Sequence, residues 1–267
     1  MRLTASLLAV MIFVAGCQSE VEAPAPSPFP SGTLVDLSHA YDEETIYWPT
    51  ASGFQLNVDA QGMTDGGYYY EAFSFSSAEH GGTHLDAPVH FAEGRRTVDE
   101  IPLQDLIGPG IVVDVSEAAL ADAGYQVTVA DLEAWEAEHG AIPDGSIVLL
   151  RTGYASFWPD RVRYMGTDAR GPDAVALLHF PGLHPDAAQW LVDNRSIAAI
   201  GLDTPSIDFG QSTLFEAHRI LFDANIPAFE NVADMSELPP MGFSVIALPM
   251  KIGEGSGAPL RIVAVVP

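Results

Sequence analysis

Four side chains that can bind a metal ion lie within eleven residues of this sequence. They are His80, His84, Asp86 and His90, in the run HGGTHLDAPVH. All four have even numbers, so in an extended strand they would project from one face, because side chains alternate between the two faces of a strand. His84 and Asp86 would then lie about 6–7 Å apart, which suits two ligands of one ion. A helix is disfavoured, because the two glycines and the proline of the run would break it.

The residue types in this run indicate a catalytic metal site. Imidazole and carboxylate groups bind Zn²⁺, Mn²⁺ or Fe²⁺. Two histidines and one carboxylate leave coordination positions open for water and substrate, whereas structural zinc sites are closed and usually contain cysteine. The alternative is a polar loop whose histidines are satisfied by hydrogen bonds. Three histidines and an aspartate of one parity in so short a run favour the metal site.

A second candidate group lies nearer the C-terminus. His218 falls on a predicted helix, and Glu230 ends the apolar run 226–229, where an unpaired buried charge would be costly. The spacing between them crosses a helix end and a proline turn, so Glu230 can swing back beside His218. We therefore predict that both side chains join Asp86 across one small polar cavity. The alternative is that His218 packs on its helix and Glu230 pairs with Arg219 or Arg261.

The run HGGTHLDAPVH resembles the HxGTHxDxPxH signature of the cyclase and bacterial kynurenine formamidase superfamily, which also contains isatin hydrolases. The similarity is not confined to this run. Further blocks that resemble the family are Gly201–Asp208, His218 with Glu230-Asn231, Leu248–Ile252 and Gly257–Arg261. Together they span nearly all of residues 34–267, and the chain is identified as a member of this superfamily.

The resemblance implies a fold and a set of roles. The fold is mixed α/β, a sheet-rich single domain of the swivelling β/β/α type over residues 34–267, assembled as a homodimer or higher homo-oligomer. On the family pattern His80, His84 and Asp86 hold a first metal ion. Asp86 bridges to a second ion, which His218 and Glu230 support. The cofactor is then one or two divalent ions, Zn²⁺ or Mn²⁺, and His90 is the acid/base residue.

The implied activity is hydrolysis of a non-peptide amide or lactam carbon–nitrogen bond in a small aromatic substrate, as in arylformamidases and isatin hydrolases. Metal-bound hydroxide would attack the carbonyl carbon, the metal would stabilise the oxyanion, and His90 would transfer the proton. Two alternatives remain. One is a lactone hydrolase or dehydrating cyclase with the same metal site. The other is an exported metal- or ligand-binding lipoprotein without turnover.

Aromatic residues are the candidate walls of a substrate pocket. Trp48 and Trp158 each precede a proline in a turn-rich segment, where binding residues are frequent. These two and Phe180 are predicted to contact the substrate. Other aromatic residues that could form pocket walls, or simply core, are Tyr68, Tyr69, Tyr70, Phe73 and Phe157.

Short β-rich runs alternate with helical patterns, as expected for an α/β sheet. Thr128 and Gly140 can cap and end a helix over residues 129–139. Two more helices are predicted over residues 185–194 and 213–223. Strands are predicted within residues 34–38, 110–115, 146–151, 197–202, 243–248 and 260–266.

The N-terminus has the layout of a secretory signal over residues 1–16, with Arg2, an apolar stretch and then small residues. Residues 14–17 also resemble a bacterial lipoprotein cleavage box, which implies lipid on Cys17, the only cysteine of the chain. The alternative is an ordinary signal peptide with an incidental cysteine. Residues 17–33 are proline-rich and predict an extended tether. We therefore expect an exported protein, lipid-anchored to the bacterial cell envelope and facing the periplasm or the exterior.

The charge balance restricts the partners. The chain has 36 acidic residues and 11 lysines and arginines, for a formal net charge of −25. Such a surface disfavours nucleic-acid binding, which needs clustered positive charge. The expected partners are a small-molecule substrate, further copies of the chain and, through the N-terminal lipid only, a membrane.

Overall fold

The computed structural model describes residues 31–267. The predicted signal segment, Cys17 and most of the predicted tether lie outside these residues. Among the described residues, no helix combines the length and the apolar character needed to cross a membrane.

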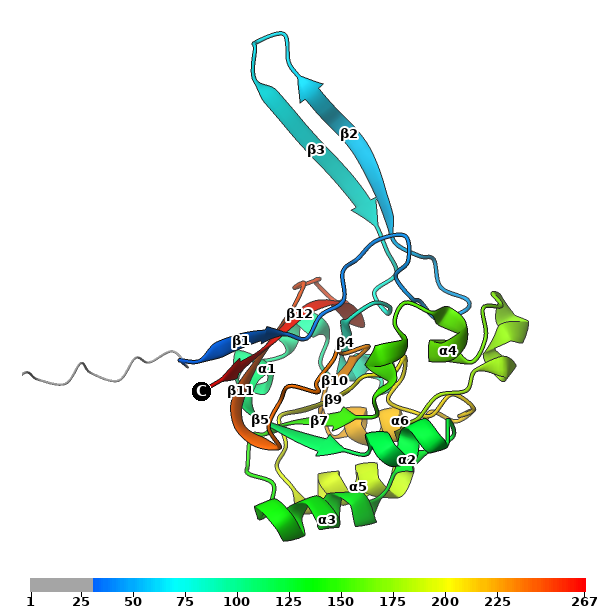
Figure 1. Ribbon diagram of the computed structural model, residues 1–267, viewed down its shortest axis with the longest axis vertical. Coiled ribbons are helices and arrows are strands. Elements are labelled where there is room, and N and C mark those ends of the chain that lie inside the picture. Colours follow the sequence, from blue (N-terminus) through cyan, green and yellow to red (C-terminus); the bar gives the residue numbers. More distant parts are fainter. Residues whose placement is uncertain (1–30) are drawn as a thin grey trace, which may run out of the picture.

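One large sheet dominates the protein (Figure 1). Its strand order is β1-β12-β11-β5-β7-β9-β10-β4, and β4 also pairs with β12, so the sheet closes on itself into a barrel-like core. The strands are β1 (Thr33–Asp36), β2 (Gln55–Met63), β3 (Tyr69–Ser76), β4 (His84–Asp86), β5 (Ile107–Asp114), β6 (Gln126–Val127), β7 (Ile147–Arg151), β8 (Gly182–Leu183), β9 (Ala199–Leu202), β10 (Ala228–Glu230), β11 (Met241–Pro249) and β12 (Gly257–Val266). The helices are α1 (Leu103–Leu106), α2 (Ser116–Ala121), α3 (Val129–His139), α4 (Arg161–Met165), α5 (Pro185–Asn194) and α6 (Glu216–Asp223), and short 3₁₀ turns cover Pro88–His90, Val98–Glu100, Tyr154–Phe157 and Pro172–Leu177.

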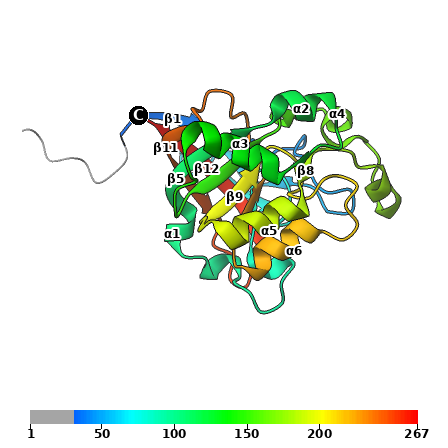
Figure 2. The same ribbon diagram turned by 90° about the horizontal axis from the view of Figure 1, so that it is seen from below.

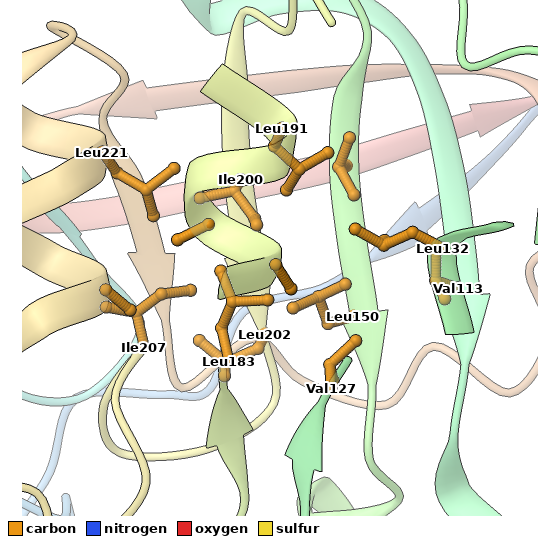
Figure 3. Close-up of a cluster of buried hydrophobic side chains, with 14 of the residues drawn as sticks. Val113, Val127, Leu132, Leu150, Leu183, Leu191, Ile200, Leu202, Ile207 and Leu221 are labelled. Carbon is orange, nitrogen blue, oxygen red and sulfur yellow. The ribbon is translucent and has the colours of Figure 1, made fainter. Parts of the chain in front are cut away.

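The parallel strands β5, β7 and β9 separate two apolar layers. Alternate residues of β7 face opposite ways, so Val148 and Leu150 pack against the helices, while Ile147 and Leu149 point to the other side of the sheet. Helices α3, α5 and α6 cover the first side (Figure 2). Figure 3 shows this contact, in which Leu132, Leu191 and Leu221 from the three helices meet side chains of the strands. Burial on both sides explains why these strands are continuous apolar runs.

Two of the three predicted helices have the expected bounds. Thr128 caps α3 by accepting a hydrogen bond from the backbone N–H of Asp131, and Gly140 ends the helix at a φ of 91°. Helix α5 covers residues 185–194, as predicted. The third helix, α6, begins at Glu216 rather than at Thr213, so that part of the prediction was wrong. Phe215 has a φ of 48°, which the preceding turn imposes and which a helix cannot include.

Strands β2 and β3 form a hairpin that the sequence analysis did not predict. Among the described residues they pair only with each other, and Figure 1 shows them projecting from the body of the protein. We call residues 55–76 the arm. Tyr69, Tyr70 and Phe73 lie on the arm and Tyr68 lies in its turn. All four are exposed, so among the described residues they form neither of the two expected features, a pocket wall or core. Aromatic residues are typical both of pocket walls and of strands. Only the pairing of β3 with β2 shows that these residues belong to a projecting hairpin.

Candidate metal centre

The residues of HGGTHLDAPVH come together at one site, but they do not form the single extended strand that was predicted. Only His84–Asp86 is extended, as β4, while His90 ends a 3₁₀ turn. His80 precedes two glycines, of which Gly82 has a φ of 58°. This turn carries His80 back so that its Nδ1 lies 2.6 Å from Oδ1 of Asp86. The prediction that one strand face presents all four side chains was therefore wrong, because the glycines break the alternation of faces.

The register of β4 brings the C-terminal residues to the same place. Strand β4 lies between β10 and β12, and His84 pairs directly with Glu230 of β10. Paired residues of neighbouring strands project from the same face. Nε2 of His84 accordingly lies 3.4 Å from Oε2 of Glu230, although the two residues are far apart in the sequence.

Asp86 connects two groups of potential ligands through its two oxygen atoms. Oδ1 lies near His80 and 3.1 Å from Nε2 of His84. Oδ2 lies 3.2 Å from Nε2 of His218, which is itself 3.1 Å from Oε1 of Glu230. The donor atoms of His80, His84 and Asp86 lie within 4.8 Å of one another, and so do those of Asp86, His218 and Glu230. The structure thus places all five predicted ligands together, and Arg261 pairs with Asp36 instead of Glu230.

Asp208 orients His218, a contact that the sequence analysis did not foresee. Its Oδ1 accepts a hydrogen bond from the backbone N–H of Ala217, and its Oδ2 accepts one from the backbone N–H of His218. Oδ2 also lies 2.6 Å from Nδ1 of His218. One buried carboxylate therefore caps the start of α6 and holds the imidazole ring. Asp208 ends the block Gly201–Asp208 that resembles the family, but its spacing to His218 does not reveal this contact.

The hydrogen bonds of the two buried rings suit a bound cation. Nδ1 of His218 donates to Asp208, and Nδ1 of His84 donates to the carbonyl oxygen of Gly82 at 2.9 Å. Each neutral ring then directs the lone pair of Nε2 toward carboxylate oxygens, and Nε2 of His84 is buried with no hydrogen-bond partner among the described residues. Lone pairs that face one another repel unless a cation or a proton lies between them. Nitrogen and oxygen donors in this arrangement fit a divalent metal ion.

The electrostatics of the cluster lead to the same requirement for positive charge. Burial alone would lower the pKa of both histidines, yet the surrounding carboxylates raise the pKa of His84 and raise the pKa of His218 well above its ordinary value. Burial and the charge of Asp86 raise the pKa of Glu230. A proton and a metal ion would therefore compete for the same nitrogen and oxygen atoms of this site.

Metal affinity should consequently fall as the pH falls. A proton competes with the ion for Nε2 of His218, whose raised pKa means that competition begins above the usual histidine value of about 6.5. Chelator competition measures the dissociation constant of Zn²⁺ or Mn²⁺ at pH values above and below about 6.5. The constant should increase steadily as the pH falls and should recover when the pH is restored. A constant that does not change with pH would contradict this assignment of the ligands.

Asp208→Asn should weaken metal binding by roughly 10–100-fold, the usual effect of removing a group that orients a ligand histidine. The asparagine amide has only one acceptor oxygen and no charge. It therefore no longer favours the tautomer of His218 that carries its proton on Nδ1. Chelator competition measures the loss. Ser212→Ala is the matched control, because Ser212 also contacts the Asp208 carboxylate, at 3.3 Å, without touching His218. Equal affinities for the Asp208→Asn protein and the unmodified protein would contradict the orienting role.

The metal-binding cluster opens into a cavity of about 310 Å³. Trp48, Phe91 and Phe215 line it together with the cluster. Their rings are close, with centroids 5.1 Å apart for Phe91 and Phe215 and 6.4 Å apart for Trp48 and Phe215. Phe91 and Phe215 were not predicted, although Phe91 directly follows His90 in the sequence.

Two of the aromatic residues predicted to contact the substrate lie elsewhere. Phe180 is fully buried in the core behind Trp48, with ring centroids 6.4 Å apart. Trp158 stacks on His39 at 4.1 Å and does not line the cavity. Both predictions rested on aromatic character alone, which does not distinguish a pocket wall from the layer of core behind it.

His90 lines the cavity beside the cluster without belonging to either group of ligands. Its ring stacks on that of His80, with centroids 3.8 Å apart. Burial lowers the pKa of His90 to about 4, although the charge of Asp86 opposes this shift. His90 is therefore a neutral imidazole near pH 7 and can accept a proton inside the cavity.

Comparisons with known proteins agree with this geometry. The family model described as putative cyclase matches residues 35–209. The chain is 35% identical over 197 residues to isatin hydrolase of Roseibium aggregatum, covering 71% of this chain and 72% of that one. It is 30% identical to kynurenine formamidase of Salinibacter ruber, covering 86% and 96%. The solved structure of isatin hydrolase A from Labrenzia aggregata, bound to benzyl benzoate, superposes with a TM-score of 0.78 at 32% identity, covering 88% and 93%.

One conclusion follows from the closed mixed sheet, from the motif around β4, where the sheet closes, and from these similarities. The fold is the mixed α/β, sheet-rich single domain that cyclase-family structures share. The matched family model covers the segment that carries His80, His84 and Asp86. This chain belongs to the cyclase family.

Proposed function

We propose that the chain is a metal-dependent hydrolase that cleaves a non-peptide amide or lactam carbon–nitrogen bond in a small aromatic substrate. The observation that carries the proposal is the buried cluster of three histidines and two carboxylates that opens into an aromatic-walled cavity. A cavity of about 310 Å³ lies at the small end of the range for ligand sites, which suits a small molecule as substrate.

The ligands divide between two ion positions in this proposal. His80, His84 and Asp86 would hold the first ion, and Asp86, His218 and Glu230 would hold the second, with Zn²⁺ or Mn²⁺ as the metal. Bound there, the metal supplies an activated water and a positive charge for the carbonyl oxygen. Asp86 and Glu230 balance that charge inside the buried site.

The remaining steps belong to side chains of the cavity. Trp48, Phe91 and Phe215 hold the aromatic ring of the substrate and exclude water from one side of it. His90, neutral near pH 7, takes a proton from the attacking water and returns it to the leaving nitrogen. This role needs no nucleophilic side chain, and no cysteine follows Cys17 in the chain.

The names of the relatives support the substrate class. One is an isatin hydrolase and the other a kynurenine formamidase. Isatin is a bicyclic aromatic lactam, and a formamidase cleaves an N-formyl amide. The proposal for this chain is the class that includes both, a carbonyl on a nitrogen attached to an aromatic ring.

Metal analysis with a substrate panel tests the proposal. The purified chain is assayed on N-formyl anilides, isatin and lactones before chelation, after chelation and after Zn²⁺ or Mn²⁺ is restored. We expect hydrolysis of an amide or lactam that chelation abolishes and one of the ions restores. Full activity in the chelated protein would contradict metal dependence, and turnover of lactones alone would contradict the carbon–nitrogen specificity.

We also propose that the protein is exported and anchored by lipid on Cys17, as the sequence of residues 1–17 suggests. Cys17→Ser should then release the protein from the membrane fraction or leave its signal unprocessed. Fractionation of cells that express each form measures this. An unchanged distribution together with normal processing of the signal would refute the anchor without affecting the proposed chemistry.

A further inference from the structure

His80 differs from the other two ligand histidines in the nitrogen atom that faces Asp86. Its Nδ1 lies 2.6 Å from Oδ1 of Asp86, whereas His84 and His218 face Asp86 with Nε2. The Nε2 atom of His80 points the other way and lies 2.9 Å from Oγ of Ser256. The orientation of the His80 ring therefore depends on how Ser256 is held.

The backbone around the start of β12 holds Ser256 next to His80. Gly257 begins β12 and pairs with Asp86 of β4, and the carbonyl oxygen of Ser256 accepts a hydrogen bond from the backbone N–H of Ala87. A Cβ atom at Gly257 would lie 2.5 Å from Cε1 of His80, so glycine is needed for the ring to lie against this backbone. The strand that closes the sheet thus also fixes the position of the Ser256 hydroxyl group.

Glu79 determines the direction in which the Ser256 hydroxyl group donates. Oε2 of Glu79 accepts hydrogen bonds from this hydroxyl at 2.6 Å and from the backbone N–H of Ser256 at 3.1 Å. A hydroxyl group has a single proton, which is already donated to Glu79, so the Ser256 oxygen accepts a hydrogen bond from Nε2 of His80. The neutral His80 ring therefore carries its proton on Nε2, and its free lone pair on Nδ1 faces Asp86.

The three ligand histidines consequently have tautomers that different acceptors fix. Nδ1 of His84 donates to a backbone carbonyl oxygen and Nδ1 of His218 donates to Asp208, so both rings have a free lone pair on Nε2. In His80 the contact with Ser256 places the proton on Nε2 instead. All three free nitrogen atoms then face carboxylate oxygens of the cluster. Such acceptors behind ligand rings are a usual means of fixing the tautomer that binds a metal ion.

We propose that Glu79 and Ser256 are positioning residues that hold His80 with Nδ1 toward the first ion position, whereas His84 faces the same position with Nε2. The inference rests on the proposed metal-dependent function, since it concerns a ligand of that site. Neither Glu79 nor Ser256 lines the cavity, so they act through His80. The His80 ring also stacks on that of His90 with centroids 3.8 Å apart, so the same two residues restrain the proposed proton acceptor.

The Zn²⁺ affinity of the Ser256→Ala protein tests the proposal. Chelator competition is carried out in the Glu230→Gln background, where only the first ligand group is complete. Ser256→Ala should weaken Zn²⁺ binding there by roughly 10–100-fold, and Ser256→Thr, which keeps the hydroxyl group, should restore most of the affinity. Ser236→Ala is the matched control, because Oγ of Ser236 donates to Asp234 at 2.7 Å in an exposed loop.

A double variant excludes compensation by Glu79. Oε2 of Glu79 lies 4.0 Å from Nε2 of His80, so after loss of the hydroxyl group a small movement lets the carboxylate accept from the ring directly. Ser256→Ala together with Glu79→Ala removes both acceptors. This protein should lose at least as much Zn²⁺ affinity as Ser256→Ala alone.

NMR of the imidazole nitrogen atoms gives a readout that depends on neither affinity nor turnover. In the Zn²⁺-loaded unmodified chain, His80 should carry its proton on Nε2, whereas His84 and His218 should carry theirs on Nδ1. Comparison with the His80→Gln protein assigns the His80 signals. A proton on Nδ1 of His80 would overturn the proposal, and so would unchanged Zn²⁺ affinity in the double variant.

These outcomes are distinct from failure of the proposed function. Unchanged affinity or the other tautomer would leave metal-dependent amide hydrolysis standing. The expected affinities and tautomers in a protein that hydrolyses no amide or lactam would overturn the proposed function alone. An unmodified chain that binds no Zn²⁺ would overturn both.

Discussion

Asp86→Asn is expected to abolish metal binding and to reduce turnover by roughly 10³-fold or more, since the metal contributes several kcal/mol to the reaction. Asp86 is the one residue common to both groups of ligands, with Oδ1 facing His80 and His84 and Oδ2 facing His218. The amide has the same shape but only one oxygen and no charge. Metal content and turnover of the purified variant measure the effect.

A comparison with Glu230→Gln makes this experiment sharper. Glu230 belongs to the second group alone, so its variant should lose one ion and keep the other if two ions are bound. Asp114→Asn is a control, because Asp114 pairs with Arg151 at the end of β5, outside the cavity. An Asp86→Asn protein with the full metal content of the unmodified chain would refute the shared-ligand assignment.

His90→Ala is expected to retain the metal and to lose turnover by roughly 10²–10⁴-fold, the usual contribution of a general acid/base. The ring of His90 lines the cavity and is neutral near pH 7, with a pKa lowered to about 4 by burial. Its removal takes away a proton acceptor without removing any member of the two ligand groups. Metal analysis and steady-state kinetics on the same preparation separate the two effects.

Two comparisons decide between a proton-transfer role and a packing role for His90. His84→Ala should lose metal as well as turnover, because His84 belongs to the first ligand group. Added imidazole should restore part of the activity of His90→Ala, since a small base can occupy the vacated space, whereas a lost packing contact would not respond. If His90→Ala and His84→Ala lose equal amounts of metal, His90 is a ligand and the acid/base assignment is wrong.

The sequence was sufficient to predict most elements of the core, although it did not predict β10. Apolar runs such as Ile147–Leu150 predict buried strands because both of their sides must be covered, and β7 indeed has apolar layers on both sides. Capping residues predicted α3 to the residue, because the N-cap and the terminal glycine act locally. Local signals did not predict the arm, whose strands are stabilised by pairing with each other and lack a buried apolar run.

For the site, the sequence by itself determined the kinds of ligand, since residue chemistry is a local property. The superfamily signature, which is also local, contains His80, His84 and Asp86, whereas His218 and Glu230 come from a second segment. Only the tertiary structure decided how they meet. The φ of Gly82 turns His80 toward Asp86, and the register of β4 against β10 sets Glu230 opposite His84. The contact between Asp208 and His218 needs the loop before α6 to close on that helix. Such contacts depend on strand pairing and loop closure between distant segments, and spacing along the chain does not encode either.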